Sequence, residues 1–354
     1  MYKSLVRNES PNKVNIKWRI TEWCNYRCSY CIRRNAFQGE RLTKEHLELY
    51  DKRAKKIGDL CKATKENICI NLIGGEISVL PLQNYLRNYW NLNNIKTICI
   101  TSNFSSDNKQ YKKFLDAFFE SKNECFVFTF SLHDEFVKDF EAFFQKAKEL
   151  QDYANKKINE HKEKKVQIYV EFVETSSNKE ACDKIISLSK KYEIKLRLDP
   201  CRDNNTEKLS VEYRGKENDK SSNLIKHWIL KTNEDQEEYC YVNEILTKFQ
   251  TDGYGVPVSG FWCYSKGFTI DFDGNIRWYI CKNFSSKYKS EKKNIDTISL
   301  EELKLSLGLV KCPGKYGCHL CGQMKAIFKD EEKNNIAKIF PEIQTMPVYK
   351  SLTN

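Results

Sequence analysis

Three cysteines near the N-terminus have the spacing of a metal-cluster loop. Cys24, Cys28 and Cys31 are separated by three and then two residues, just after an apolar run over 16–23. Four thiolates occupy every iron of a [4Fe-4S] cube, so a loop that supplies three leaves one iron open to a small chelating molecule. A zinc knuckle is the alternative, because Cys-x2-Cys pairs also bind tetrahedral zinc, although zinc sites seldom use this triplet. The triplet therefore points to catalysis at an open iron.

The chain around this loop alternates strand-length apolar runs with longer amphipathic stretches, which is typical of beta-alpha units around a parallel sheet. With 354 residues, it can bury a core of barrel size. Strands are predicted over 15–22, 68–73, 95–101, 125–132, 166–173 and 194–198. Helices are predicted between them over 43–57 with Thr43 as the cap, 82–90, 108–121, 136–155 and 179–192. Six such units are too few for a closed eight-stranded barrel.

Polar residues mark the carboxyl ends of these strands, where barrel enzymes carry their functional groups. Gly74, Gly75 and Glu76 directly follow the second strand; the glycines permit close backbone approach, and Glu76 offers an acceptor. Further candidates lie at the ends of the third to sixth strands: Ser102, Asn103, Ser131, His133, Glu171, Arg197 and Asp199. Each could equally be a satisfied structural group, and His133 could be either an acid–base residue or a hydrogen-bonding strand end.

The cysteine spacing, with Tyr30 just before the third cysteine, and the Gly-Gly-Glu segment resemble the radical S-adenosylmethionine (SAM) superfamily. The resemblance covers 14–202 and implies a partial (β/α)6 barrel whose open mouth is covered by the C-terminal part of the chain. It also implies that the open iron binds SAM and that cluster reduction cleaves SAM to a 5'-deoxyadenosyl radical. The residues then assigned to SAM binding are Tyr30, Gly74, Gly75, Glu76, Ser102, Asn103, Ser131, Glu171 and Arg197.

A second group of cysteines lies in the C-terminal third of the chain. Alternation around Asp273-Gly274 predicts a hairpin that returns Cys281 toward Cys263. Cys312, Cys318 and Cys321 come next with five and two intervening residues, giving five candidates for four positions, and a structural zinc site is again the alternative. The region resembles the auxiliary-cluster domains of the SPASM and Twitch subgroups. That resemblance implies a second [4Fe-4S] cluster on Cys263, Cys281, Cys318 and Cys321, with Cys312 as a competitor or a free thiol.

The predicted fold class is α/β, with a small appended domain. We expect a barrel over 14–202, a polar linker and bridging helix over 203–258, a β-hairpin-plus-helix cluster domain over 259–325, and a helical tail over 326–354. Within these segments, 223–249 and 324–339 are expected to be helical. Three other cysteines lie in strand-like runs and are expected in the core: Cys69, Cys99 and Cys125.

Composition constrains the location and the partners. Fifteen cysteines without a secretory signal favour metal ligands and buried thiols in a cytoplasmic protein over disulfides. No apolar run approaches the ~20 residues of a membrane span. The net charge of +11 comes from lysines spread along the chain rather than from an arginine patch. This distribution predicts a solvated surface and gives little support to nucleic-acid binding.

The resemblance implies hydrogen abstraction from an unactivated carbon of a small polar molecule or a peptide, with net oxidation or cross-linking. Electrons would come from a flavodoxin- or ferredoxin-type donor. The short stretch before the first strand favours a small or carrier-borne substrate, or a peptide delivered by another protein. One alternative is a redox-neutral epimerase in which Cys201 or Cys312 returns the hydrogen atom. Another is a non-catalytic zinc- or cluster-stabilised binding module, which predicts that zinc satisfies every site.

Overall fold

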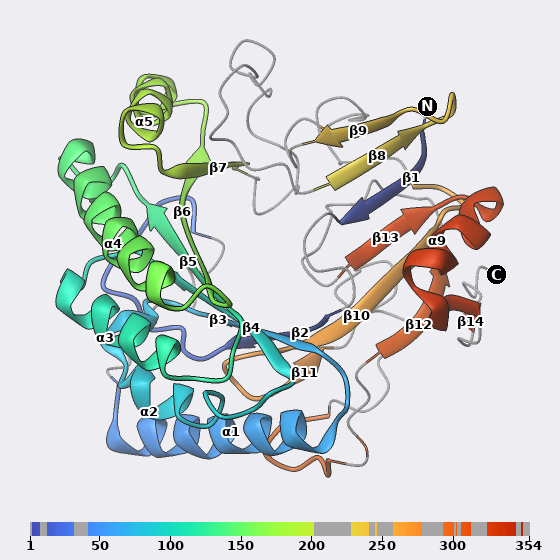
Figure 1. The fold of residues 1–354 in the computed structure, drawn as a ribbon, viewed down its shortest axis with the longest axis horizontal. Helices are drawn as coiled ribbons and strands as arrows, with labels where there is room; N and C mark the ends of the chain where they lie inside the picture. The colour runs from blue at the N-terminus through green and yellow to red at the C-terminus, as the bar shows by residue number, and fades with distance from the viewer. Residues whose placement is uncertain are drawn as a thin grey trace.

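One mixed β-sheet, curled into an open half-barrel, organises the molecule (Figure 1). The computed structural model describes residues 2–7, 13–31, 42–201, 228–240, 245, 258–277, 293–300, 302, 306–312, 324–344 and 348–349. Within these ranges the sheet contains 14 strands, and β7 and β9 lie at the two ends of its main path. Helices cover the outer side of the curl, so the inner side is the concave face on which strand residues can meet.

Parallel strands form the barrel part of this sheet, in the order β7-β6-β5-β4-β3-β2-β10. Their bounds are β2 Val14–Arg19, β3 Ile68–Ile73, β4 Ile95–Ser102, β5 Cys125–Leu132, β6 Lys165–Glu174, β7 Lys195–Pro200 and β10 Trp262–Ile270. The first six match the predicted strands, so the partial barrel is confirmed. The seventh, β10, extends it from the C-terminal region, with Phe268 opposite Ile16 in a parallel pair.

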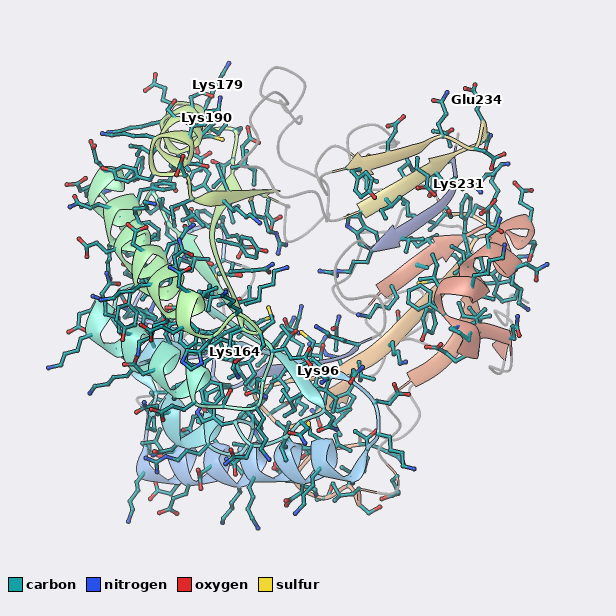
Figure 2. The ribbon with its side chains drawn as sticks, in the orientation of Figure 1. Lys96, Lys164, Lys179, Lys190, Lys231 and Glu234 are labelled. Atoms are coloured by element: carbon teal, nitrogen blue, oxygen red, sulfur yellow. The ribbon has the colours of Figure 1, made fainter. Side chains whose placement is uncertain are left out.

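The helices pack on the convex face. Their bounds are α1 Lys44–Ala63, η1 Ile77–Val79, α2 Leu82–Leu86, α3 Asn108–Phe119, α4 Phe140–Glu160 and α5 Lys179–Tyr192. Thr43 caps α1 as predicted, its side chain accepting a hydrogen bond from the His46 amide. None of the helices within the described ranges is long and apolar enough to cross a membrane. Lys179 and Lys190 point outward from α5 and are exposed, as expected of a solvated lysine surface (Figure 2).

The main hydrophobic core lies between the barrel strands and these helices. Alternate strand residues, among them Trp18 and Phe128, pack against helix residues such as Phe118 and Phe144. Because successive strand side chains point to opposite faces, the residues between them line the concave face. Alternation therefore assigns the polar strand residues to the interior of the half-barrel.

The remaining strands form a second arm that continues the sheet beyond β10. Their bounds, and those of the helices beside them, are β1 Tyr2–Arg7, β8 Trp228–Thr232, β9 Glu237–Cys240, β11 Ile276–Arg277, β12 Ser306–Lys311, β13 Met324–Phe328, η2 Asp330–Glu332, α9 Lys333–Ile339, η3 Pro341–Gln344 and β14 Val348–Tyr349. β13, β1, β8 and β9 pair antiparallel in that order. The small hairpin of β10 and β11 turns at Asp273-Gly274, as predicted.

Two helix predictions in this arm are only partly right. Within the predicted bridging helix over 223–249, residues 228–240 form the β8–β9 hairpin, which turns at Asn233–Asp235 with a positive φ of 64° at Asp235, whereas Ile245 is helical. The run 324–339 begins with strand β13 and becomes helical from Asp330, first as the 3-10 helix η2 and then as α9. Both strands owe their conformation to pairing with β1, a partner far away in sequence, which outweighs local helix preference.

The core prediction for three cysteines is only partly right. Cys69 is buried, but its Sγ lies 3.8 Å from the Sγ of Cys99, and Cys99 and Cys125 are half-buried. The strand neighbours of all three belong to the helix-facing core, whereas these cysteines do not. Alternation therefore assigns the three thiols to the concave face rather than to the packed core.

Candidate functional site

The candidate site is built around the cysteine loop (residues 24–31), which comes after the carboxyl end of β2. Cys28 is buried, and Cys24 and Cys31 are half-buried. Burial, together with the charges of Cys31, Glu135 and Cys24, raises the pKa of the Cys28 thiol to about 12. Burial also raises the pKa of Cys24, with Cys31 among the contributors. The three thiols thus lie within electrostatic range of one another, and a positively charged metal centre could hold them together as thiolates.

In the part of the chain that the structure describes, no three His, Cys, Asp or Glu side chains are arranged to hold a metal ion. A single zinc ion would bind its thiolates at about 2.3 Å, whereas a [4Fe-4S] cube would place each thiolate on a different iron. By its chemistry, a set of three thiols fits a cube that leaves one iron to another ligand.

Gly74 and Gly75 hold the end of β3 directly against the start of this loop. The Gly75 amide donates to the Thr21 carbonyl at 2.7 Å, and the Glu76 amide donates to the Trp23 carbonyl at 2.8 Å. A Cβ on Gly75 would lie 1.8 Å from the Trp23 carbonyl oxygen, and one on Gly74 would lie 2.6 Å from that of Thr21. Only glycine fits so close an approach, so the predicted reason for the two glycines holds, with the backbone of residues 21–23, just before the loop, as the neighbour.

The carboxylate of Glu76 is fully buried and ties the ends of β3 and β4 together. It accepts hydrogen bonds from the Ser78 amide at 2.7 Å, the Ser102 hydroxyl at 2.8 Å and the Asn103 amide at 2.5 Å. The Ser102 hydroxyl also lies 2.9 Å from the Tyr111 hydroxyl. Glu76 and Ser102 are therefore engaged within the protein, and their assigned contact with SAM stays a prediction.

Asn103 joins the end of β4 to the cysteine loop. Its side-chain amide donates to Asn25 Oδ1 at 2.7 Å and lies 4.0 Å from the Sγ of Cys24. Asn25 in turn donates to the Ser105 hydroxyl at 3.0 Å. Asn103, assigned from the sequence to SAM, is thus next to the first cysteine. Its amide lies at the limit of hydrogen-bonding distance from that sulfur.

A row of polar side chains crosses the ends of β5, β6 and β7. Ser131, Glu171 and Arg197 are neighbours in register, and the Ser131 hydroxyl donates to Glu171 at 3.3 Å. The Arg197 guanidinium lies 3.6 Å from Glu171 and 2.8 Å from Asp199. Burial, reinforced by Asp199 and opposed by Arg197, raises the pKa of Glu171 to about 7. The structure therefore brings these predicted residues together, with a carboxyl group that titrates near neutrality.

His133 lies beside the cysteine loop and is suited to hydrogen bonding rather than to proton transfer near neutral pH. Burial lowers its pKa to about 4, so the ring is neutral. Its Nδ1 lies 2.8 Å from the hydroxyl of Tyr30, whose own pKa is raised by burial. The protonated phenol can therefore donate to the neutral imidazole. This contact places Tyr30 at the same strand edge as the other candidates.

The second cysteine group is described only in part. Cys263 on β10 and Cys312 after β12 both pack against one small hydrophobic cluster, and the Cys312 amide donates to the Phe261 carbonyl at 2.8 Å. These two thiols are thus brought to the same strand pair. The other predicted ligands, Cys281, Cys318 and Cys321, lie outside the described residues. Cys201, the other hydrogen-donor candidate, is half-buried at the end of β7, where its amide donates to the Glu174 carbonyl at 2.8 Å.

Sequence reasoning missed the residues that hold the far side of the cysteine loop. Glu135 accepts hydrogen bonds from Ser29, and the ring of Phe136 stacks on Tyr26. Both contacts come from the segment just after β5. The sequence could have indicated these residues. Position 135 comes only three residues after the predicted strand 125–132, and the carboxyl ends of parallel strands share one edge of the sheet.

Comparison with known proteins yields weak structural similarity. No family model and no curated protein matches the chain. A solved structure described as native anSMEcpe with bound AdoMet and Cp18Cys peptide matches with a TM-score of 0.44 and 17% identity, over 82% of this chain and 80% of that one. Hexahistidine-tagged anSMEcpe with bound AdoMet matches with a TM-score of 0.45 and 15% identity, over 94% of each chain. Similarities this low assign neither a family nor a ligand to the present chain.

Proposed function

We propose that this chain is a radical SAM enzyme whose SAM-cleaving cluster is held by Cys24, Cys28 and Cys31. One observation carries the proposal: the cysteine triplet and the Gly74-Gly75 strand end are joined at one edge of a partial parallel barrel. The glycines leave no room for a side chain against the backbone of residues 21–23, which leads into the loop. A cysteine triplet that served only to fold a zinc knuckle would not have to lie at the carboxyl edge of a parallel barrel.

A [4Fe-4S] cluster in the loop would supply the electron for reductive cleavage of SAM to a 5'-deoxyadenosyl radical. The protein's own residues would place SAM beside it. Asn103 contacts the loop on one side, Tyr30 contacts His133 on the other side, and Gly74-Gly75 lies against the backbone just before the loop. Glu76 acts by fixing the β3 and β4 ends, since its carboxylate already accepts three hydrogen bonds.

The row of Ser131, Glu171 and Arg197 is the best candidate for contacts with SAM or with a polar substrate. It offers a hydroxyl, a titratable carboxyl group and a guanidinium within a few ångströms of one another. Such a set suits a small polar molecule or a peptide backbone rather than an apolar substrate. The substrate class proposed is therefore a small polar molecule or a peptide.

We further propose net oxidation of the substrate, with a second [4Fe-4S] cluster on Cys263, Cys281, Cys318 and Cys321 as the electron acceptor. The placement of Cys263 and Cys312 against one hydrophobic cluster supports Cys312 as a nearby alternative ligand. A flavodoxin- or ferredoxin-type protein would deliver the first electron, and a cytoplasmic location would keep the thiols reduced.

The test is product formation from SAM by reconstituted, reduced protein under anaerobic conditions. The wild-type chain should release 5'-deoxyadenosine, and a Cys24, Cys28, Cys31 triple alanine variant should release none. Cys125→Ala is the matched control, because it removes a half-buried thiol outside the loop and should leave product formation intact. An iron count near eight per chain, falling to about four in the triple variant, would support the second cluster. Absence of 5'-deoxyadenosine from the wild-type protein would refute the proposal.

A further inference from the structure

The turn just after β5, residues 133–136, contacts the cysteine loop through three separate features. It is a tight turn, since the amides of Phe136 and Val137 both donate to the His133 carbonyl, at 3.0 and 2.8 Å. We name it the clamp turn. A turn closed by its own backbone hydrogen bonds presents its side chains in fixed directions. Three of those side chains, His133, Glu135 and Phe136, contact the loop.

The first feature is the carboxylate of Glu135. It accepts a hydrogen bond from the Ser29 amide at 2.8 Å and a second one from the Ser29 hydroxyl. Two hydrogen bonds to one ionised group are stronger than a pair of neutral ones and define its orientation. Ser29 is the residue next to Cys28, so this contact fixes the backbone that carries the second thiol.

The second and third features are aromatic. His133 lies 2.8 Å from the Tyr30 hydroxyl, and its ring centroid is 5.9 Å from the rings of both Tyr30 and Tyr26. Phe136 stacks on Tyr26 with centroids 4.6 Å apart and an angle of 6°. The clamp turn therefore holds residues 26, 29 and 30, which lie on both sides of Cys28.

We propose that the clamp turn orders the cysteine loop independently of any bound metal, with Glu135 and His133 as its positioning residues. A loop that must collect three thiols around one cluster loses conformational entropy on binding, and a loop already held by the protein loses less. The opposite side of the loop is held in the same manner by Asn103 through Asn25. The role in metal binding rests on the proposed function, whereas the ordering of the loop does not.

The charge of Glu135 adds a second consequence. This carboxylate is held on the amide and hydroxyl of Ser29, next to Cys28, so it places a negative charge beside the loop. A cluster held beside a fixed anion is harder to reduce, because reduction adds an electron to the same region. Glu135 would therefore lower the reduction potential of a cluster in this loop, and neutralising it would raise that potential.

Amide hydrogen exchange on the metal-free chain tests the ordering directly. In Glu135→Gln, the Ser29 amide should exchange roughly three- to tenfold faster, because it loses a charged acceptor. His133→Phe keeps an aromatic ring but removes the acceptor for Tyr30, and it should speed exchange at 26–31. Glu124→Gln is the matched control, because Glu124 lies just before β5 and its exposed carboxylate pairs with Lys96 on β4. Exchange in the loop should stay unchanged in this variant.

Coupling between the two partners gives a sharper test. If the Ser29 side chain acts through Glu135, adding Ser29→Ala to Glu135→Gln should speed exchange less than the product of the two single effects. Loop exchange that is unaffected by both Glu135→Gln and His133→Phe would overturn the clamp and leave the proposed enzyme intact. If His133→Phe does not fold, the Glu135→Gln variant alone decides the test. The Glu135 side chain is exposed, so this substitution should leave the fold intact.

Iron retention and redox potential form the second readout. The Glu135→Gln and His133→Phe proteins should lose iron to a chelator several-fold faster than the wild type, and Glu135→Gln should have a more positive potential by EPR titration. Both effects should be missing from Glu124→Gln. A wild-type chain that binds no iron at the triplet would refute the proposed function, and hydrogen exchange would still decide the clamp.

Discussion

Removal of the Glu76 carboxylate should destabilise the fold more than any surface substitution. Its two oxygens satisfy three buried donors: the Ser78 amide, the Ser102 hydroxyl and the Asn103 amide. An unsatisfied buried donor costs about 1–3 kcal/mol, and water can enter part of the space that a shorter side chain leaves. We therefore expect Glu76→Ala to lower the free energy of unfolding by about 3–5 kcal/mol.

The Glu76→Gln variant keeps the size and shape of the side chain but removes its negative charge. Its single oxygen can still accept from Ser78 and Ser102, but its amide group then meets the Asn103 amide, donor against donor. The expected loss is about 1–3 kcal/mol, between wild type and Glu76→Ala. The control Glu120→Ala changes an exposed glutamate and should stay within about 0.5 kcal/mol.

Urea unfolding of the metal-free chain, monitored by far-UV circular dichroism, measures this series. A free energy for Glu76→Ala within about 1 kcal/mol of wild type would contradict the structural role of the carboxylate. It would mean that Glu76 does not join the two strand ends in solution and is available to a ligand. The series thus decides whether Glu76 serves the site by holding β3 and β4 together.

Contacts at the site and between α1 and the C-terminal part of the chain support three further predictions. Gly75→Ala should abolish iron binding at the triplet, measured by iron content, because its Cβ would lie 1.8 Å from the Trp23 carbonyl oxygen. The free energy of unfolding of the wild-type chain should fall as pH rises from about 4.5 to about 7. Folding raises the pKa of Glu171 from 4.5 to about 7, so in this range the folded chain holds a proton that the unfolded chain has released. Glu171→Gln should flatten that part of the profile in thermal melts. Arg53→Ala should lower the free energy of unfolding by about 2–4 kcal/mol. The buried guanidinium makes two hydrogen bonds to Asp296, at 2.9 and 2.6 Å, and one to the Phe272 carbonyl. An unchanged urea midpoint would contradict a stabilising role for these contacts.

The barrel could be predicted because its signals are local. Each of its six predicted strands is a strand-length stretch rich in apolar residues, and an amphipathic stretch with a recognisable start, such as Thr43, comes between neighbours. Because the carboxyl ends of parallel strands share one edge of the sheet, the sequence also placed Glu76, Asn103 and Ser131 at the same edge without any knowledge of distances. Local signals also predicted the turn at Asp273-Gly274.

The second arm could not be predicted in this way. Its strands are short, and β1 obtains its partners more than 200 residues away in β8 and β13. The stretch 228–240 carries its hairpin signal only in the turn residues Asn233 to Asp235, which a helical interpretation overlooks. Contacts between exposed polar residues were equally hidden, since Ser29 and Glu135 are separated by 106 positions and neither lies in a motif.

The EPR spectrum of the reduced, reconstituted protein, recorded with and without SAM, would test the assignment of the cysteine triplet more directly than any other measurement. We expect the signal of a reduced [4Fe-4S] cluster, with g-values that change when SAM is added, and loss of the SAM-dependent change in the Cys24, Cys28, Cys31 triple alanine variant. A spectrum that SAM leaves unaltered, or a triplet that holds zinc instead of iron, would contradict a SAM-binding cluster in this loop.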